Sequence, residues 1–235
     1  MSKITYVYCF SKNLAVDEEQ YNINLFLLKE SIKLLKKHYS YRIVTDKDTY
    51  LDLIGLCDIL QVVDTSSFNF LDDFKISMLS KLEENEILVD PDIFVYKEIK
   101  FNTDTDIIFE FKDKPNRYWY QDDIKDIKGT LLYEKIMSIK NIPFIPNIGF
   151  LKISNPTLLS NYKKLYEYYK KDLFEKLDFN FPRFSILLGQ YLLGILLYEG
   201  NYSYIDIKSA NTGKVYEHLS GPNKYRKYMS NKPLI

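Results

Sequence analysis

Short apolar runs alternate with amphipathic segments along the first 96 residues. Residues 4–10, ITYVYCF, are β-branched and aromatic, and this composition predicts a strand. Residues 22–39 follow, with apolar side chains at helical spacing and lysines on the other face, which predicts a helix. The same alternation continues toward Tyr96. It predicts strands over 41–46, 59–65 and 87–89, and helices over 48–56 and 71–85.

This alternation predicts the class of fold. Strands that alternate with helices form a largely parallel sheet with right-handed crossovers. Ligands of such sheets bind beyond the carboxyl ends of the strands. We therefore expect an α/β protein with a mixed, mostly parallel central sheet flanked by helices.

The pattern is less regular after residue 96. The polar and aromatic residues 112–130 predict a loop. The apolar segment 186–198 has 13 residues, fewer than the roughly 20 that cross a bilayer, so it predicts a buried core helix. The remaining pattern predicts strands over 106–111, 144–154 and 202–208, and a helix over 156–177.

Composition narrows the class of protein. Hydrophobic residues make up 46% and charged residues 27%, a balance typical of a globular protein, and the net charge is zero. We therefore expect no nucleic-acid partner. The 28 lysines against four arginines indicate an AT-rich genome, which weakens lysine clusters as functional signals. Cys9 and Cys57 lie in apolar segments and predict buried free thiols, and with no secretory signal they favour the cytoplasm.

Two aspartates separate two apolar runs in the segment ENEILVDPDIFVY. Asp90 and Asp92 follow the predicted strand 87–89, and no basic residue is adjacent to either. A buried carboxylate without a partner is costly. Because side chains two apart in an extended chain point the same way, both can aim at one hard cation, either Mg²⁺ or Mn²⁺. The alternative is a solvated turn, since such pairs also occur by chance.

A second group of candidate residues lies in the segment EHLSGPNKYRK. His218 is a ligand type suited to Mn²⁺, Gly221 permits close approach of the backbone to a phosphate, and Lys224 supplies a point charge for a diphosphate. The alternative is a loop histidine beside a solvated basic segment.

Together, the D-x-D pair and the H-x-x-G-x-x-K segment resemble the GT-A-fold glycosyltransferases, in particular retaining family 8. That family has a basic residue about fifteen positions before D-x-D, where this chain has Lys75, and an Asn-x-Gly where it has Asn147 and Gly149. It also has an acidic residue before a helical glutamine, whereas Gly189 precedes Gln190 here. The chain also resembles small GT-A-like proteins of bacteria and large DNA viruses. A cytoplasmic location is expected, which for a viral protein is the cytoplasm of the host.

The resemblance implies a glycosyltransferase that uses Mn²⁺ or Mg²⁺. It would move a sugar, with retention, from a UDP-sugar to a hydroxyl of a glycan or glycoprotein. It implies one domain, with 1–96 as the nucleotide-binding half, 97–224 as the donor-sugar and acceptor half, and 225–235 as a basic tail. The implied metal ligands are Asp90, Asp92 and His218; the nucleotide-sugar contacts are Phe10, Ser11, Thr45, Asp46, Lys75, Asp90, Gly149, Gly221 and Lys224; the catalytic residues are Asn147, Gln190 and Asp123.

Each implied residue has a structural alternative. Lys75 is then an exposed helix lysine, Asn147 a turn residue, Gln190 a hydrogen-bonded core residue, and Asp46 a helix cap. Because Gly189 replaces an acid, either the donor phosphate acts as the base or a substitute carboxylate does; the candidates are Asp122, Asp123 and Asp206.

Two other functions stay open beside the transferase. A nucleotidyltransferase uses a similar sheet, but residues 11–20 lack the glycine-rich basic loop expected of one. A degenerate GT-A-like protein that binds nucleotide or glycan without transfer is the other, and a homodimer is left open.

Overall fold

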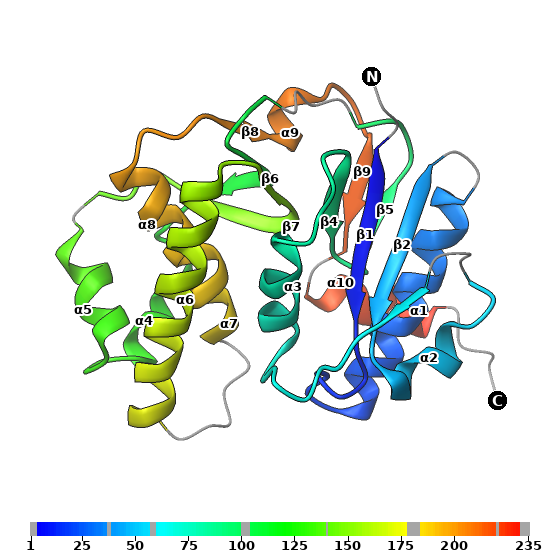
Figure 1. The fold of residues 1–235 in the computed structure, drawn as a ribbon, viewed down its shortest axis with the longest axis horizontal. Helices are drawn as coiled ribbons and strands as arrows, with labels where there is room; N and C mark the ends of the chain where they lie inside the picture. Colours follow the sequence, from blue (N-terminus) through cyan, green and yellow to red (C-terminus); the bar gives the residue numbers. More distant parts are fainter. Residues whose placement is uncertain are drawn as a thin grey trace. The chain divides into compact units, whose positions relative to one another are not determined.

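The chain divides into two compact units (Figure 1). The structure is a computed structural model, and it describes residues 4–36, 39–56, 60–99, 104–139, 141–177, 184–219 and 221–230. The first unit comprises Met1–Lys75, Leu82–Phe101 and Ala210–Ile235, and the second comprises Ile76–Lys81 and Asn102–Ser209. The first unit therefore contains both the D-x-D segment and the C-terminal histidine segment.

Parallel strands form the core of the first unit. They lie in the order β3-β2-β1-β4, and Figure 1 shows β1 and β2 running side by side. Phe10 pairs with Thr45, and Tyr8 pairs with Val89, so the carboxyl ends of these strands lie at one edge. These strands confirm the sequence prediction; their bounds are β1 (Thr5–Phe10), β2 (Ser40–Thr45), β3 (Leu60–Val62) and β4 (Glu86–Val89).

Helix α1 buries one face, whereas no residue of α10 is buried. Helix α1 begins after Asp17, whose side chain accepts a hydrogen bond of 2.7 Å from Gln20 N. Its buried stripe includes Leu28, Ile32 and Leu35, at the spacing the sequence indicated. The bounds are α1 (Glu18–Leu35), α2 (Lys47–Leu53), α3 (Leu71–Leu79, which continues into the second unit) and α10 (Pro222–Met229).

An antiparallel strand pair joins two distant parts of the sequence within the first unit. Strand β5 (Ile93–Val95) follows the aspartates, and β9 (Tyr216–His218) precedes α10. Ile93 pairs with His218 in this ribbon. The pairing therefore brings the aspartate turn to the histidine.

The second unit is built around a three-stranded section. Strand β6 pairs antiparallel with β7 and parallel with β8. The register between β6 and β7 shifts between Phe109 and Phe111, which face Leu151 and Asn147. The strands are β6 (Ile107–Asp113), β7 (Ile145–Ile153) and β8 (Tyr204–Asp206), and the helices are α4 (Tyr118–Asp126), α5 (Leu131–Ser138), α6 (Pro156–Lys176), α7 (Phe184–Ile186), the π-helix η1 (Leu187–Tyr191), α8 (Leu192–Glu199) and α9 (Ile207–Ala210).

The predicted loop over 112–130 is wrong, because α4 lies within it. Tyr120, Ile124 and Ile127 are all buried, at helical spacing, but polar residues between them conceal the pattern. The strand predicted over 202–208 is shorter than expected, because a helix begins at its end. Asp206 Oδ1 accepts a hydrogen bond from Ser209 N at 3.0 Å and so caps α9. Helix α10 lies across the start of the segment predicted as a basic tail.

The apolar segment 186–198 is helical and buried, as predicted. Leu187, Leu192 and Ile195 are fully buried, and a side chain at Gly194 would come within 3.2 Å of the Phe144 carbonyl oxygen. None of the described helices has the length and apolarity that crossing a bilayer requires. The mixed, mostly parallel α/β class is confirmed.

Candidate metal and nucleotide site

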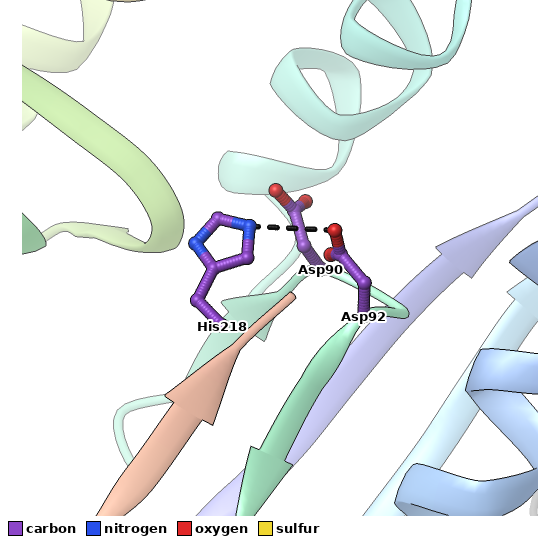
Figure 2. A group of neighbouring side chains, drawn as sticks. All are labelled: Asp90, Asp92 and His218. Carbon is purple, nitrogen blue, oxygen red and sulfur yellow. Dashed lines mark ion pairs between the residues drawn. The ribbon is translucent and has the colours of Figure 1, made fainter. Parts of the chain in front are cut away.

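Asp90, Asp92 and His218 converge in the first unit. One ligand atom from each lies within 4.8 Å of the others, and Figure 2 shows the imidazole directed toward the carboxylates. The aspartates come from the turn between β4 and β5, and the histidine ends β9. The tertiary structure therefore assembles the trio of residues that the resemblance implied.

Backbone hydrogen bonds fix this turn. Ile93 N donates to Asp90 O at 3.2 Å, which closes the turn around Pro91. Leu219 N donates to Asp92 O at 3.0 Å, which ties the turn to β9. The two carboxylates are thus held by main-chain contacts on both sides.

Asp92 is the buried member of the trio, with 1% of its surface exposed. Its Oδ2 lies 3.4 Å from His218 Nε2 and 2.6 Å from Lys224 Nζ. Burial opposes ionisation of this carboxyl, but the imidazole and the ammonium outweigh it and hold its pKa below the usual range. This charged Oδ2 is buried, and its two neighbours both come from the C-terminal segment of the chain. An anionic oxygen so placed, beside a second carboxylate and an imidazole, fits a divalent cation.

Lys75 supplies the counter-charge for Asp90. It is 3% exposed, so it is not the exposed helix lysine of the alternative interpretation. Its Nζ contacts Asp90 Oδ1 directly and lies 3.8 Å from Asp72 Oδ1. Burial alone would lower the pKa of Lys75, but the two carboxylates reverse this and raise it. Sequence reasoning missed Asp72, although its spacing of three from Lys75 on a helix was a usable signal.

Gly221 sets the position of Lys224. Its φ of 55° lies in the region that favours glycine, and it is the N-cap of α10. Nothing lies within 4 Å of the site where a Cβ would stand, so backbone conformation rather than space requires glycine. Lys224 N then donates to Gly221 O at 3.1 Å in the first turn of α10. The Lys224 side chain therefore reaches the Asp92 carboxylate from the first turn of α10.

The predicted base contacts lie where β1 and β2 end. Ser11, Thr45 and Asp46 are each 4% exposed or less. Ser11 Oγ, Thr45 Oγ1 and Asp46 Oδ2 are buried and have no hydrogen-bond partner among the described residues. Asp46 also caps α2, because its Oδ1 accepts from Thr49 N at 2.8 Å. Capping therefore occupies one oxygen and leaves the other for a ligand.

Phe10, which was predicted to contact the nucleotide, has a packing role in the structure. It is buried and stacks on Tyr21, with ring centroids 5.5 Å apart. Tyr21 OH donates to Asp52 Oδ2 at 2.6 Å. Phe10 thus supports the wall beside the polar atoms rather than adding one of its own.

The remaining predicted residues lie in the second unit. Asn147 Oδ1 accepts from Gly149 N at 3.0 Å, at the register shift of β7, which gives both residues a structural role there. Gln190 lies in the π-helix, where its Oε1 accepts from Tyr120 OH at 2.8 Å. Sequence reasoning missed Tyr120, because it lies in the segment predicted as a loop. Short π-helices are frequent at functional sites, so Gln190 stays a candidate for a catalytic role.

The three substitute carboxylates differ in their surroundings. Asp122 is exposed and pairs with Lys125 at 3.1 Å, and Asp206 accepts from Ser209 through both oxygens. Asp123 is 2% exposed on α4. Gly189 contributes its carbonyl, which accepts from Tyr162 OH at 2.8 Å. Asp123 and Asp206 are both buried, and helix capping accounts for Asp206 but not for Asp123.

Comparison with solved structures gives a match over most of the chain. An active-site mutant of LgtC superposes with a TM-score of 0.50 at 11% identity, covering 93% of this chain and 88% of that one. This chain has the GT-A glycosyltransferase fold. A complex of LgtC, a galactosyltransferase, with donor and acceptor sugar analogues gives a TM-score of 0.49 at 10% identity, over 93% of this chain and 88% of that one.

The match to GlyE of Streptococcus pneumoniae TIGR4 has a TM-score of 0.47 at 12% identity. It covers 87% of this chain but 45% of GlyE, so this chain spans less than half of that protein. No family model and no curated protein matches the sequence. The GT-A fold is thus established, and identities of this size leave the activity to the site itself.

Proposed function

We propose that this chain is a metal-dependent glycosyltransferase. It would transfer a sugar from a UDP-sugar to a hydroxyl group on a glycan or glycoprotein, with retention. The observation that carries the proposal is the convergence of Asp90, Asp92 and His218 with Lys224 at one end of a GT-A sheet. All four side chains come from the first unit.

The trio is proposed to hold Mn²⁺ or Mg²⁺. When bound, such an ion neutralises charge on the leaving nucleoside diphosphate. Asp92 offers its buried Oδ2, and Lys75 orients Asp90 through a direct ion pair. Lys224 is placed to exchange its contact with Asp92 for one with a phosphate oxygen, because its side chain is 32% exposed.

The base is proposed to bind where β1 and β2 end. Asp46 Oδ2 is an acceptor, and the imide N–H of uracil is a matching donor. The Ser11 and Thr45 hydroxyls can donate to the uracil carbonyls. UDP is therefore our first choice of nucleotide.

The residues of the second unit are assigned to the donor sugar. We assign Asn147 and Gln190 to polar contacts with it, and Asp123 to the place of the acid that Gly189 lacks. The second candidate function is nucleotide binding without transfer. It is favoured by one observation: Gly189 offers a backbone carbonyl, already bonded to Tyr162, where the family has a carboxylate.

Direct binding measurements test the metal and nucleotide assignments. Titration calorimetry should show Mn²⁺ binding that Asp92→Asn and His218→Ala each weaken by at least about tenfold. The matched control is Asp64→Asn, which removes a carboxylate from an exposed loop of the same unit and should leave binding unchanged. Mn²⁺ affinity that is unaffected by Asp92→Asn would sink the metal assignment.

Turnover separates the two candidate functions. We expect UDP to bind in preference to CDP, GDP and ADP, and a panel of UDP-sugars to include one that is hydrolysed slowly when Mn²⁺ is present. Nucleotide binding without hydrolysis or transfer of any donor would favour the binding protein. Cys9 is buried as a free cysteine, and Cys57 lies outside the described residues. We assign the chain to the reducing cytoplasm, with which a buried free thiol is compatible.

A further inference from the structure

Ser31 is a buried polar residue in the middle of α1 that the sequence did not single out. It is fully buried on the face of α1 that packs toward β1 and β5. A serine inside a helix usually bonds to its own helix backbone. Here Ser31 Oγ donates instead to the Ile93 carbonyl oxygen, at 2.5 Å. Ile93 directly follows the proposed metal ligand Asp92.

The strand pairing explains why Ile93 needs this bond. Leu219 N donates to Asp92 O, so Ile93 and His218 form a non-hydrogen-bonded pair of the antiparallel ribbon. The N–H and C=O of Ile93 therefore point away from β9. Its N–H donates to Asp90 O, and its C=O accepts from Ser31. Ser31 thus completes the backbone hydrogen bonding of buried Ile93, which follows the proposed ligand Asp92 and is paired with the proposed ligand His218.

Tyr8 orients the serine hydroxyl. Tyr8 OH and Ser31 Oγ lie 2.9 Å apart, and both residues are fully buried. A serine hydroxyl has one proton, and Ser31 gives it to Ile93. Tyr8 must therefore donate to Ser31, which fixes a chain of donors from Tyr8 through Ser31 to Ile93. Burial raises the pKa of Tyr8, so its phenol keeps the proton that this chain requires.

We propose that Ser31, oriented by Tyr8, is a positioning residue that fixes the Asp92 carboxylate relative to His218 by holding the Ile93 carbonyl. The inference rests on the proposed metal site. Three of the hydrogen bonds described above involve the backbone of this turn. One lies within the turn, from Ile93 N to Asp90 O; one comes from Leu219 N, next to β9; and one comes from Ser31 on α1. Removing the third leaves β5 free to shift on the α1 side, which changes the distance between Asp92 and the imidazole.

Mn²⁺ affinity measured without nucleotide tests the proposal. We expect Ser31→Ala to weaken Mn²⁺ binding about tenfold, as the loss of outer-shell partners does at metal sites. Tyr8→Phe should give a smaller loss, because Ser31 keeps its bond to Ile93. Should Ser31→Ala fail to fold, Ser31→Cys keeps the size and a weak donor, and it should show an intermediate affinity.

Tyr41→Phe is the matched control. Tyr41 OH donates to the Leu56 carbonyl oxygen at 2.7 Å in the same unit, so this variant also loses one hydroxyl-to-carbonyl bond. The midpoint temperature of thermal unfolding should fall in both Tyr41→Phe and Ser31→Ala. The affinity for Mn²⁺ should fall in Ser31→Ala alone.

The outcomes separate the two proposals. Wild-type affinity in both Ser31→Ala and Tyr8→Phe, with loss in Asp92→Asn, overturns the positioning role and leaves the metal site standing. Equal loss of affinity in Tyr41→Phe also overturns it, since general destabilisation would then explain the effect. Absence of Mn²⁺ binding by the wild-type chain overturns the proposed metal site and this inference together.

Discussion

Lys224 Nζ lies 2.6 Å from Asp92 Oδ2, and His218 Nε2 lies 3.4 Å from the same oxygen. Two groups from the C-terminal segment thus meet one buried carboxylate from the turn after β4. An oxygen that balances an ammonium charge attracts a divalent cation less strongly. Lys224 and a metal ion therefore compete for Asp92, whereas Lys224 and a diphosphate attract each other.

The first prediction concerns this competition. Lys224→Met should tighten Mn²⁺ binding in the absence of nucleotide by about tenfold, because a charged hydrogen bond contributes about 1.5 kcal/mol. The same variant should weaken UDP binding in the presence of Mn²⁺. Calorimetric titration measures both affinities. Lys227→Met, on the same helix but over the Phe94 ring, is the control, and weaker Mn²⁺ binding by Lys224→Met would contradict the competition.

The second prediction concerns the ion pair between Arg42 and Glu86, which flank β1 from β2 and β4. Two guanidinium nitrogens contact the two carboxylate oxygens at 2.5 and 2.8 Å, and the Arg42 side chain is 12% exposed. Glu86→Gln should lower the free energy of unfolding by about 2 kcal/mol, because it leaves a partly buried cation without its counter-charge. Urea unfolding measures the loss. In the exposed pair of Glu30 with Lys33, Glu30→Gln should change stability by less than about 0.5 kcal/mol, and equal effects would refute the argument.

The third prediction concerns acid stability. Asp106 accepts hydrogen bonds from Asn155 Nδ2 at 2.7 Å and from Ser203 N at 2.7 Å, and these bonds lower its pKa. A lowered folded-state pKa stabilises the protein above the unfolded value of about 3.9, and this contribution is lost as pH falls through the folded-state value. Asp106→Asn should therefore unfold at lower urea than the wild type at pH 7, and the gap should narrow below pH about 4.

Urea midpoints between pH 3 and pH 7 measure that gap. Asp126→Asn, at an exposed position of α4, should show no such gap at either end of the range. A gap for Asp106→Asn that stays constant down to pH 3 would mean that its carboxylate does not carry the effect.

The fourth prediction concerns Cys9 on β1. It is 2% exposed, and burial raises the pKa of its thiol to about 12, although the nearby Lys75 charge opposes this. Because the thiolate is the nucleophile, we expect no reaction of Cys9 with iodoacetamide at pH 8 in the folded protein, and complete reaction in urea. Mass spectrometry of the Cys9 peptide measures this. Alkylation of Cys9 in the folded protein would show that β1 is accessible.

Regular elements were predicted where side-chain periodicity is a local property. The apolar stripe of α1 buries one side of the helix, and the continuous β-branched and aromatic run of β1 is buried on both faces, so both patterns are visible in the sequence. The prediction failed at α4, where Tyr120 and Ile124 face inward between polar neighbours, and only the packed unit shows which face is buried. The π-turn at Gln190 and the register shift at Asn147 have no periodic signal.

By itself, the sequence determined that Asp90 and Asp92 follow an apolar strand, that Gly221 precedes a basic segment, and that the aspartates need a partner if they are buried. Only the tertiary structure decided which partners they have. Lys75 reaches Asp90 from α3, and Lys224 reaches Asp92 because β5 pairs with β9. The physical reason is that a buried charge is balanced through space, by whichever opposite charge the fold brings near, and strand pairing between distant segments leaves no local pattern in the chain.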